Sequence, residues 1–357
     1  MTPSFPRSVL TAALALGAVP AFAGTQIGDY LNFSGFGTLG LTRTNTDGAD
    51  FIRDAEASGA TKDVNANVDS NFGLQLTGTA TPWLSATVQM LSAERSQSYM
   101  TTELEWAFVK VRPLDGLTLR GGRMALPVFA VSDSRNVGYA NNWLRPPGEV
   151  YGLAMIPRLD GADASYSAEV GSSTFTATAM AGKGNLPRRG ATDLLTDNLR
   201  GLNLQWETDG VMVRLGQVRT RVHTSVAGSV DEYKFTGAGV LIDRNNIVAQ
   251  AEYVTRRSGS NASLIDANGW YAMGGYRLGA WLPYASYSAT RPNVTSKVHA
   301  AGPQDTTAIG ARWDVLKAMD VKFQLERIDT KGTRGISFTS VLAKPVTAAS
   351  VTVDFVF

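Results

Sequence analysis

The chain has 357 residues, with 33 basic and 31 acidic side chains, two histidines and no cysteine. This nearly neutral balance lacks the excess of positive charge by which proteins bind nucleic acid, and without cysteine neither disulfides nor thiolate metal sites can form. Apolar residues make up 44% of the chain and the mean hydropathy is -0.07, which fits strands in which every second residue is apolar.

The first segment of the chain has the features of a secretory signal peptide. Arg7 precedes a short apolar run over 9–19, and residues 21–23, Ala-Phe-Ala, have the small-x-small pattern of a cleavage site. The run is too short to span a bilayer, which takes about 20 apolar residues, and no later segment is long enough either. We therefore predict that residues 1–23 are a cleaved signal peptide and that 24–357 form one exported domain.

Beyond the signal peptide, the chain consists of segments with period-two alternation separated by Gly, Pro, Asn and Asp, and no 3.6-residue periodicity interrupts them. In one such segment, Phe72, Leu74 and Leu76 lie on one face, opposite Gln75 and Thr77. The fold is therefore predicted to be all-β. The predicted strands are 31–43, 69–81, 84–96, 102–113, 117–123, 161–169, 173–182, 199–208, 211–221, 232–243, 247–257, 268–278, 281–290, 305–314, 320–329 and 348–356.

The connections between these strands alternate in length. Tight turns such as Asp209-Gly210 alternate with mostly longer polar segments, of which the third, 124–160, is the longest. Short turns at one end and long loops at the other are the arrangement of a transmembrane antiparallel β-barrel, with the turns on the periplasmic side. About sixteen strands close a sheet wide enough to leave an aqueous channel. A soluble sandwich does not need this asymmetry.

Aromatic residues support the same interpretation, because Trp and Tyr prefer the two membrane interfaces. One set falls near the turn ends of strands: Trp83, Trp206, Trp281, Trp313 and Phe357. A second set falls near the opposite ends: Tyr233, Tyr253, Trp270 and Tyr287. We expect these two sets to form the aromatic girdles of a membrane barrel.

The last strand ends on an aromatic residue, with Val351, Val353, Phe355 and Phe357 on one face. This tail resembles the closing strand of Gram-negative outer-membrane barrels, where it serves as the assembly signal. With the signal peptide, the sixteen strands and the short turns, the whole exported chain resembles a Gram-negative general porin. The resemblance implies an outer-membrane channel, a homotrimer embedded in lipid and lipopolysaccharide, and recognition by the barrel-assembly machinery.

The resemblance also gives the third loop, 124–160, a role, because porins of this architecture fold that loop into the barrel to form the constriction. Residues 142–151, Asn-Trp-Leu-Arg-Pro-Pro-Gly-Glu-Val-Tyr, look like a segment found in porin-like proteins. Its two prolines restrict the backbone and would let the loop keep one shape in a wet channel.

Charged groups at the constriction sort solutes, because a low-dielectric wall focuses the electric field there. On the third loop the candidates are Asp133, Arg145, Glu149, Arg158 and Asp160, and on or beside the wall they are Arg120, Arg123, Arg214, Arg312 and Lys322. We expect acids on the loop to face bases on the wall, and Arg120 is the first candidate. The alternative is that the loop charges are solvated or paired and that some wall arginines lie at the rims.

The strand 102–113 has no assigned orientation from its sequence. Leu104, Trp106 and Phe108 compete with Ala107, Val109 and Val111 for the lipid face, so Glu105, Lys110 and Arg112 could not be placed. The second loop, 97–101, is shorter than the loop that latches the trimer in many general porins, which puts that latch in doubt.

Two basic pairs fall near predicted external loops, Arg188-Arg189 and Arg256-Arg257. They could bind lipopolysaccharide phosphates, although such pairs are usually only solvated. The acids of the first loop, at 47, 50, 54, 56 and 63, do not have the spacing of an EF-hand, so a disordered acidic loop is favoured over a calcium site.

Other classes of function remain as alternatives. A barrel enzyme would need a nucleophile with a positioned base, and His223 and His299 both fall in predicted loops without a nucleophile motif. No cofactor or metal is expected. We predict a non-enzymatic channel for passive diffusion of small hydrophilic solutes and ions, with a mild anion preference. A channel specific for phosphate, an organic acid or a sugar is the alternative, and a secreted β-rich adhesin is a third.

Overall fold

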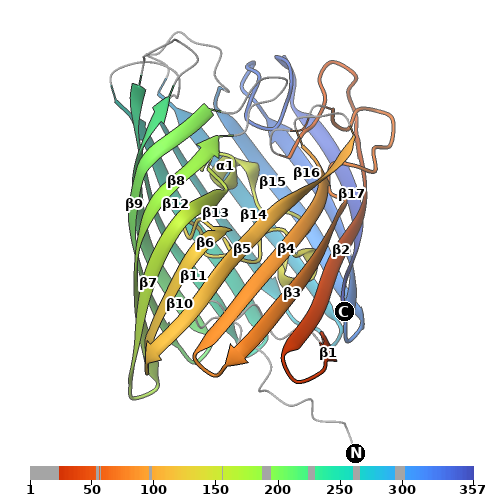
Figure 1. The fold of residues 1–357 in the computed structure, drawn as a ribbon. Helices are drawn as coiled ribbons and strands as arrows, with labels where there is room; N and C mark the ends of the chain where they lie inside the picture. Colours follow the sequence, from red (N-terminus) through yellow and green to blue (C-terminus); the bar gives the residue numbers. More distant parts are fainter. Residues whose placement is uncertain are drawn as a thin grey trace, which may run out of the picture.

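The computed structural model describes residues 24–53, 56, 58–95, 99–154, 156–186, 194–223, 230–259, 266–293 and 302–357. The predicted signal peptide, 1–23, lies outside the described residues. One antiparallel sheet contains all the strands, and it closes on itself because β17 pairs with β2 while β9 pairs with β10. The predicted all-β barrel of sixteen strands is confirmed (Figure 1).

The strands run in chain order around the barrel, and a short additional strand, β1, pairs with the start of β2. Their bounds are β1 (Thr25–Ile27), β2 (Leu31–Thr44), β3 (Asn71–Thr81), β4 (Leu84–Glu94), β5 (Met100–Leu114), β6 (Leu117–Ala125), β7 (Arg158–Val170), β8 (Ser173–Leu186), β9 (Leu194–Thr208), β10 (Val211–His223), β11 (Val230–Arg244), β12 (Ile247–Ser258), β13 (Ala267–Tyr276), β14 (Trp281–Pro292), β15 (Gln304–Leu316), β16 (Met319–Asp329) and β17 (Val346–Val356). The helical segments are η1 (Gly138–Ala140) and α1 (Gly148–Tyr151), and none in the described chain is long and apolar enough to cross a membrane.

Most strand ends lie within a few residues of their predicted positions, and the largest differences are at the loop end. There, β9 begins at Leu194 rather than at 199. Strands that rise above the lipid meet water on both faces, so the alternation that defines them in the sequence fades. Strand β1 was not predicted, because three residues are too few to show a period.

The short turns lie at one end of the barrel and the long loops at the other (Figure 1). Two turns use residues with positive φ at both central positions: Asp209 and Gly210, at 29° and 76°, and Asn245 and Asn246, at 53° and 66°. Two-residue turns of this handedness match the twist of the flanking strands, and Asn, Asp and Gly adopt them at the lowest cost.

A β-bulge in β5 explains why its orientation could not be read from the sequence. Gln89 of β4 pairs with Trp106, whereas the next residue, Met90, pairs with Leu104, so Glu105 is an extra residue. An extra residue reverses the alternation on either side of it. The lipid face of β5 therefore carries Leu104 before the bulge and Val109 after it, and these side chains are 37% and 47% exposed.

The barrel closes where the last strand meets the first, and glycines make room for the terminal aromatic rings. Phe357 and Gly35 exchange two backbone hydrogen bonds, of 2.9 and 3.0 Å. The ring of Phe357 lies over Gly35 and the ring of Phe355 over Gly37, so that a Cβ atom at either glycine would overlap the ring. We call this junction of β17 and β2 the seam.

The aromatic residues predicted for the two girdles lie on the outer surface near the two ends of the barrel, with one exception. Trp83, Trp281 and Trp313 are 53%, 43% and 38% exposed at the turn end, and Trp281 stacks on Trp313 at 5.2 Å between ring centroids. Tyr253, Trp270 and Tyr287 are exposed at the loop end. Tyr233 differs from the expectation: it is 2% exposed and faces the lumen, where its hydroxyl donates to the Leu153 carbonyl.

Candidate functional site

The third loop folds into the barrel as expected, and it occupies part of the lumen (Figure 1). It connects Ala125 at the end of β6 to Arg158 at the start of β7. We call residues 126–157 the inner loop. The predicted loop, 124–160, was too long at both ends, because Arg158 and Asp160 are strand residues that pair with β6.

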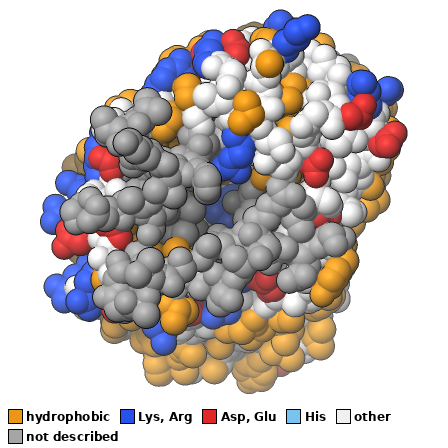
Figure 2. All heavy atoms as spheres, turned by 90° about the horizontal axis from the view of Figure 1, so that it is seen from above, with side chains coloured by type: hydrophobic (Ala, Val, Ile, Leu, Met, Phe, Trp, Pro, Cys, Tyr) orange, Lys and Arg blue, Asp and Glu red, His pale blue; other side chains and the backbone are white. Residues whose placement is uncertain are grey.

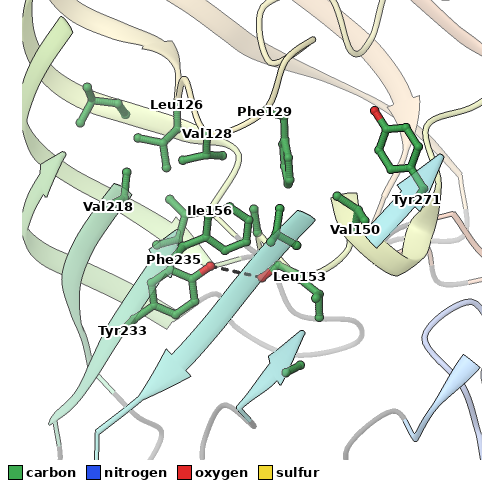
Figure 3. Packing of buried hydrophobic residues seen from close by; sticks show 14 of the residues in the cluster. Leu126, Val128, Phe129, Val150, Leu153, Ile156, Val218, Tyr233, Phe235 and Tyr271 are labelled. Carbon is green, nitrogen blue, oxygen red and sulfur yellow. Dashed lines mark hydrogen bonds between the residues drawn. The ribbon is translucent and has the colours of Figure 1, made fainter. Parts of the chain in front are cut away.

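Apolar side chains attach the inner loop to the lumen face of β10–β13 (Figure 3). Phe129 stacks on Tyr151 at 4.2 Å and meets Phe235 of β11 edge-on at 5.5 Å. Trp143 meets Tyr271 of β13 edge-on at 5.4 Å. Burying each large side chain contributes about 1.5–3 kcal/mol, so this cluster alone holds the loop firmly against one wall.

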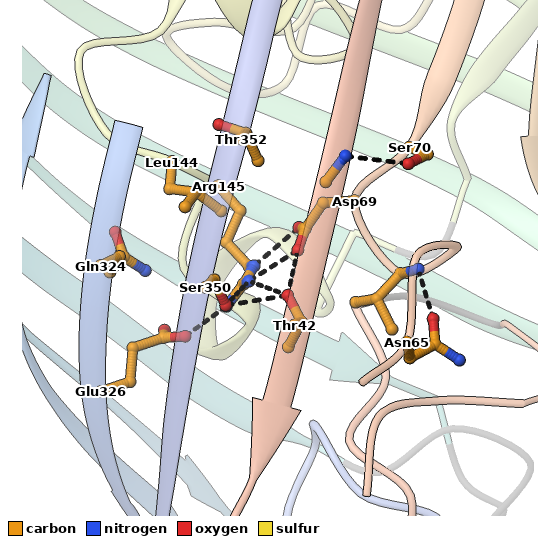
Figure 4. Close-up of polar contacts among 12 residues, drawn as sticks. Thr42, Asn65, Asp69, Ser70, Leu144, Arg145, Gln324, Glu326, Ser350 and Thr352 are labelled. Carbon is orange, nitrogen blue, oxygen red and sulfur yellow. Dashed lines mark hydrogen bonds and ion pairs between the residues drawn. The ribbon is translucent and has the colours of Figure 1, made fainter. Parts of the chain in front are cut away.

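A buried arginine attaches the same loop to the seam (Figure 4). Arg145, 6% exposed, donates from Nε and Nη2 to the Asp69 carboxylate at 2.8 and 2.7 Å, and from Nη1 to Glu326 of β16. Its Nη2 also donates to Ser350 of β17 at 2.6 Å and to Thr42 of β2 at 3.2 Å. One guanidinium thus connects the inner loop to the first strand of the barrel wall and its last two.

Glu149 is a second attachment point on the same loop. Its carboxylate accepts hydrogen bonds from Ser288 at 2.9 Å, from Gln304 at 2.7 Å and from Thr306, and the residue is 2% exposed. A cavity of about 30 Å³ lies beside it. This volume has room for a water molecule but not for a solute, so no solute fits beside Glu149 in this structure.

Three of the predicted wall bases bind backbone carbonyls of the inner loop. Arg214 donates to Pro127, Arg312 donates to Tyr139 and Asn141 at 2.7 and 3.0 Å, and Lys322 donates to Gly138 at 2.7 Å.

Lys322 is fully buried, with ion pairs to Asp320 at 3.1 Å and Asp354 at 2.8 Å. The alternation placed Arg214, Arg312 and Lys322 correctly on the lumen face. However, they hold the loop, and their side chains are not free to contact a solute.

Three further predicted residues fill a gap in the wall above Ala107, where β5 and β6 stop pairing in the described structure. Arg123 pairs with Asp160 at 2.7 Å, and Arg158 pairs with Glu103 and with the bulged Glu105 at 2.9 and 3.3 Å. Both arginines also donate to the Leu104 carbonyl. Unpaired backbone groups at membrane depth are costly, so these side chains seal the gap rather than form the constriction.

The remaining two predicted residues, Arg120 and Asp133, interact electrostatically without an ion pair between them in the described structure. Arg120 of β6 is ion-paired with Asp163 of β7, and its guanidinium lies 5.5 Å from the centroid of the Phe108 ring. Asp133 of the inner loop lies within electrostatic reach of Arg120 and Arg214, and burial raises its pKa. A loop acid and a wall base thus influence each other, but the ion-pair partner of Arg120 is the wall residue Asp163, and a role of either in the constriction stays a prediction.

Two lumen-facing cations beside Arg120 were missed. Lys110 of β5 is the direct cross-strand partner of Arg120, and Arg112 lies two residues further along the same face and is exposed. The bulge at Glu105 concealed them, and the only signal was the double alternation of the strand. Viewed from the loop end, the barrel mouth is hollowed and Lys or Arg side chains are visible inside it (Figure 2).

The other predicted sites divide between described and undescribed residues. His299, Asp54 and Arg188-Arg189 lie outside the described residues. His223 is at the end of β10 beside Asp197, with Nε2 and the carboxylate 2.6 Å apart. Within the described chain, no three His, Cys, Asp or Glu residues form a metal-binding group.

The described part of the first loop packs against other residues, whereas its acidic sequence had favoured a disordered loop. Phe51 meets Phe338 edge-on at 5.7 Å, and Arg145 lies beneath the Phe51 ring at 5.1 Å. At the rim, Arg256 is buried, and Arg257 donates to Asn268 at 2.8 Å. Arg256 is therefore not presented to lipopolysaccharide.

Solved barrels with a similar fold include OmpT of Vibrio cholerae in a trimer form, with a TM-score of 0.61 and 15% identity over 92% of this chain and 99% of that chain. Salmonella typhi OmpF, in complex with daunomycin, has a TM-score of 0.61 and 15% identity over 92% and 97%. An anion-selective porin from Comamonas acidovorans has a TM-score of 0.60 and 11% identity over 92% and 99%. At such identities the likeness concerns the fold.

No curated protein matches the sequence. Residues 10–333, however, match the family described as Gram-negative porin, which covers most of the chain. The barrel, the inner loop and the charged lumen agree with that match, and they indicate a channel rather than an enzyme. The chain belongs to the Gram-negative porin family and forms a channel of the outer membrane.

Proposed function

We propose that this channel lets small hydrophilic solutes and ions diffuse passively, with a preference for anions. The observation that carries the preference is the charge of the wall facing the inner loop. There, Lys110, Arg112 and Arg120 gather on β5 and β6, and the nearest wall carboxylate, Asp163, is already paired with Arg120. The net charge of these side chains is positive where a solute would pass between this wall and Asp133.

The low-dielectric barrel strengthens this effect, because it focuses field lines through the water-filled lumen. An excess of positive charge there raises the local concentration of anions and lowers that of cations. Asp133, on the opposite side of the passage, moderates the excess and keeps the preference mild. Glu252, another lumen acid, accepts hydrogen bonds from Tyr151, Tyr271 and the Ala130 amide and interacts electrostatically with Arg214, so its charge is partly compensated.

The test is the conductance of the purified protein in planar bilayers, with the reversal potential measured across a salt gradient. We expect stepwise openings and a reversal potential of the sign for anions, which moves toward zero in Arg120→Ala. The matched control is Arg327→Ala, which removes an exposed arginine at the loop end of β16. The absence of stepwise conductance, or cation selectivity that persists in Arg120→Ala, would contradict the proposal.

A channel specific for one anion is the second candidate, since the unpaired cations are concentrated on one wall. Aromatic rings arranged along the lumen would instead favour sugars. Most of the lumen aromatics described above, including Tyr233, Phe235 and Tyr271, pack against the inner loop, so a sugar channel has less support than an anion channel.

We also propose that the protein is exported by cleavage after Ala23 and assembles as a homotrimer in a membrane containing lipopolysaccharide. We further propose that the barrel-assembly machinery recognises the terminal face of Val351, Val353, Phe355 and Phe357. The trimer form of the V. cholerae barrel supports the oligomer by analogy. N-terminal sequencing of the mature protein and cross-linking in native membranes test the first two proposals. Deletion of Phe357 followed by membrane fractionation tests the third.

A further inference from the structure

One row of lumen-facing residues crosses four neighbouring strands. Ser85 of β4 is the register partner of Lys110, Lys110 is the partner of Arg120, and Arg120 is the partner of Asp163. Arg112 lies on the same face of β5, one step toward the turn end. The row thus places a hydroxyl, two cations and one acid side by side on the open wall.

Two like charges in direct cross-strand register repel each other, because their Cβ atoms are only about 4.5–5.5 Å apart. Asp163 compensates one of the two: Nε and Nη2 of Arg120 donate to its carboxylate at 2.5–3.1 Å. Lys110 is half-buried, and it has no hydrogen bond or ion pair to any residue that the structure describes. The row therefore contains one cation without a counter-ion, Lys110, beside one that is paired, Arg120.

Donor groups remain on both cations. In the described structure the Nη1 group of Arg120 makes no hydrogen bond, and neither does the ammonium of Lys110. Arginine and lysine form their strongest hydrogen bonds with carboxylate and phosphate oxygens. A ligand with two or more negatively charged oxygens can accept from both groups at once, whereas chloride offers a single centre.

We propose that Lys110 and Arg120 form a binding subsite for small oxyanions, carboxylates or phosphates, within the lumen. The ligand oxygens accept from Nζ of Lys110 and Nη1 of Arg120, and Arg112 and the Ser85 hydroxyl complete the ring of donors. This subsite rests on the proposed anion channel and refines it, because it predicts selection among anions of equal charge.

The other basic groups that bind the inner loop lack this availability. Arg145, Arg312 and Lys322 each donate to two or more acceptors, whereas Nζ of Lys110 and Nη1 of Arg120 donate to none in the described structure. Arg214 donates to the Pro127 carbonyl of the inner loop. Selection among anions should therefore respond to Lys110 far more than to these anchoring residues.

The experiment measures the open-channel chloride current in planar bilayers while acetate, succinate or inorganic phosphate is added at constant ionic strength. For the wild-type protein we expect a saturable decrease of the current. If acetate and succinate both block at lower concentrations than phosphate, carboxylates are the preferred ligands. If phosphate blocks at the lowest concentration, phosphate is preferred. In Lys110→Met we expect the half-blocking concentration to rise about tenfold, as the loss of a charge-assisted hydrogen bond implies, and Lys110→Arg should restore it.

Asp163→Asn provides a second variant with the opposite sign. It releases Nε and Nη2 of Arg120, so the half-blocking concentration should fall. Lys62→Met is the matched control, because Lys62 is an exposed first-loop residue paired with Asp47, and it should leave the block unchanged.

Three results would overturn the subsite: no saturable block in the wild type, equal block in wild type and Lys110→Met, or a weaker block in Asp163→Asn. If any of them occurred while the reversal potential still indicated anion preference, only the subsite would fail. A cation-selective wild type would overturn the proposed function itself.

Discussion

Lys322 and Lys110 both face the lumen, and both have charged residues on neighbouring strands. Their environments nevertheless differ. Lys322 is fully buried between Asp320, Asp354 and the inner-loop carbonyl of Gly138. Lys110 is half-buried and faces another cation. The difference shows that residue type and strand face do not set the role of a lumen charge. Its partners set the role: Lys322 has two wall carboxylates, on β16 and β17, and one inner-loop carbonyl, whereas the register partners of Lys110 are Ser85 and Arg120.

The largest expected effect separates these two lysines directly. Lys322→Met leaves the buried Asp354 without a cation and leaves Asp320 with Arg312 as its remaining ion-pair partner, which should lower the free energy of unfolding by about 3–5 kcal/mol. Lys110→Met removes a repulsion and should stay within about 1 kcal/mol of the wild type. Urea unfolding in detergent, followed by tryptophan fluorescence, measures both. Equal decreases in the free energy of unfolding for the two variants would contradict the distinction between the two lysines.

Arg145→Ala tests whether the loop depends on its attachment to the seam. Asp69 and Glu326 would then face each other without a counter-ion, and the penalty of about 3–5 kcal/mol favours release of the loop segment around residue 145. We expect a larger single-channel conductance with frequent substates, while the folded barrel persists on an unheated gel. The triple variant Arg145→Met, Asp69→Asn, Glu326→Gln removes the uncompensated charges and should recover most of the wild-type conductance. Unchanged conductance in Arg145→Ala would argue against the anchor.

Gly35→Ala tests the seam to which the loop is attached. A methyl group there overlaps the Phe357 ring, and overpacking of this kind costs about 1–3 kcal/mol. The temperature at which the folded form converts to the unfolded form on a gel should fall. Gly274→Ala is the control, since no heavy atom lies within 4 Å of its added Cβ. Equal transition temperatures for the two variants would mean that the ring moves aside freely.

The smallest effect concerns the acid on the open side of the channel. Because burial raises the pKa of Asp133, this group loses its charge as the pH falls through that raised pKa. Arg120 and Arg214 face it and keep their charge, and Asp163 lies nearby. Anion preference should therefore increase on mild acidification, and Asp133→Asn should show the increased preference at neutral pH with a weaker pH response. A reversal potential independent of pH in the wild type would contradict this assignment.

The barrel was predictable from the sequence, because apolar and polar side chains must alternate along every strand in lipid and because the turns are only a few residues long. It also placed Arg214, Arg312 and Lys322 on the correct face, since alternation determines the face. It could not predict their inner-loop partners, which lie between 87 and 184 residues away along the chain. Lys110 was lost for a local reason, because a single bulged residue, Glu105, reverses the alternation in the strand that carries it.

The pairing of Phe355 and Phe357 with glycines of β2 has a consequence for synthesis. The first strand of the barrel wall, β2, pairs with the last strand, β17. A chain that lacks β17 would leave one edge of β2 and one edge of β16 without partners. Such edges cannot remain in lipid. Closure of the barrel therefore requires β17, and a chain without this strand has no seam.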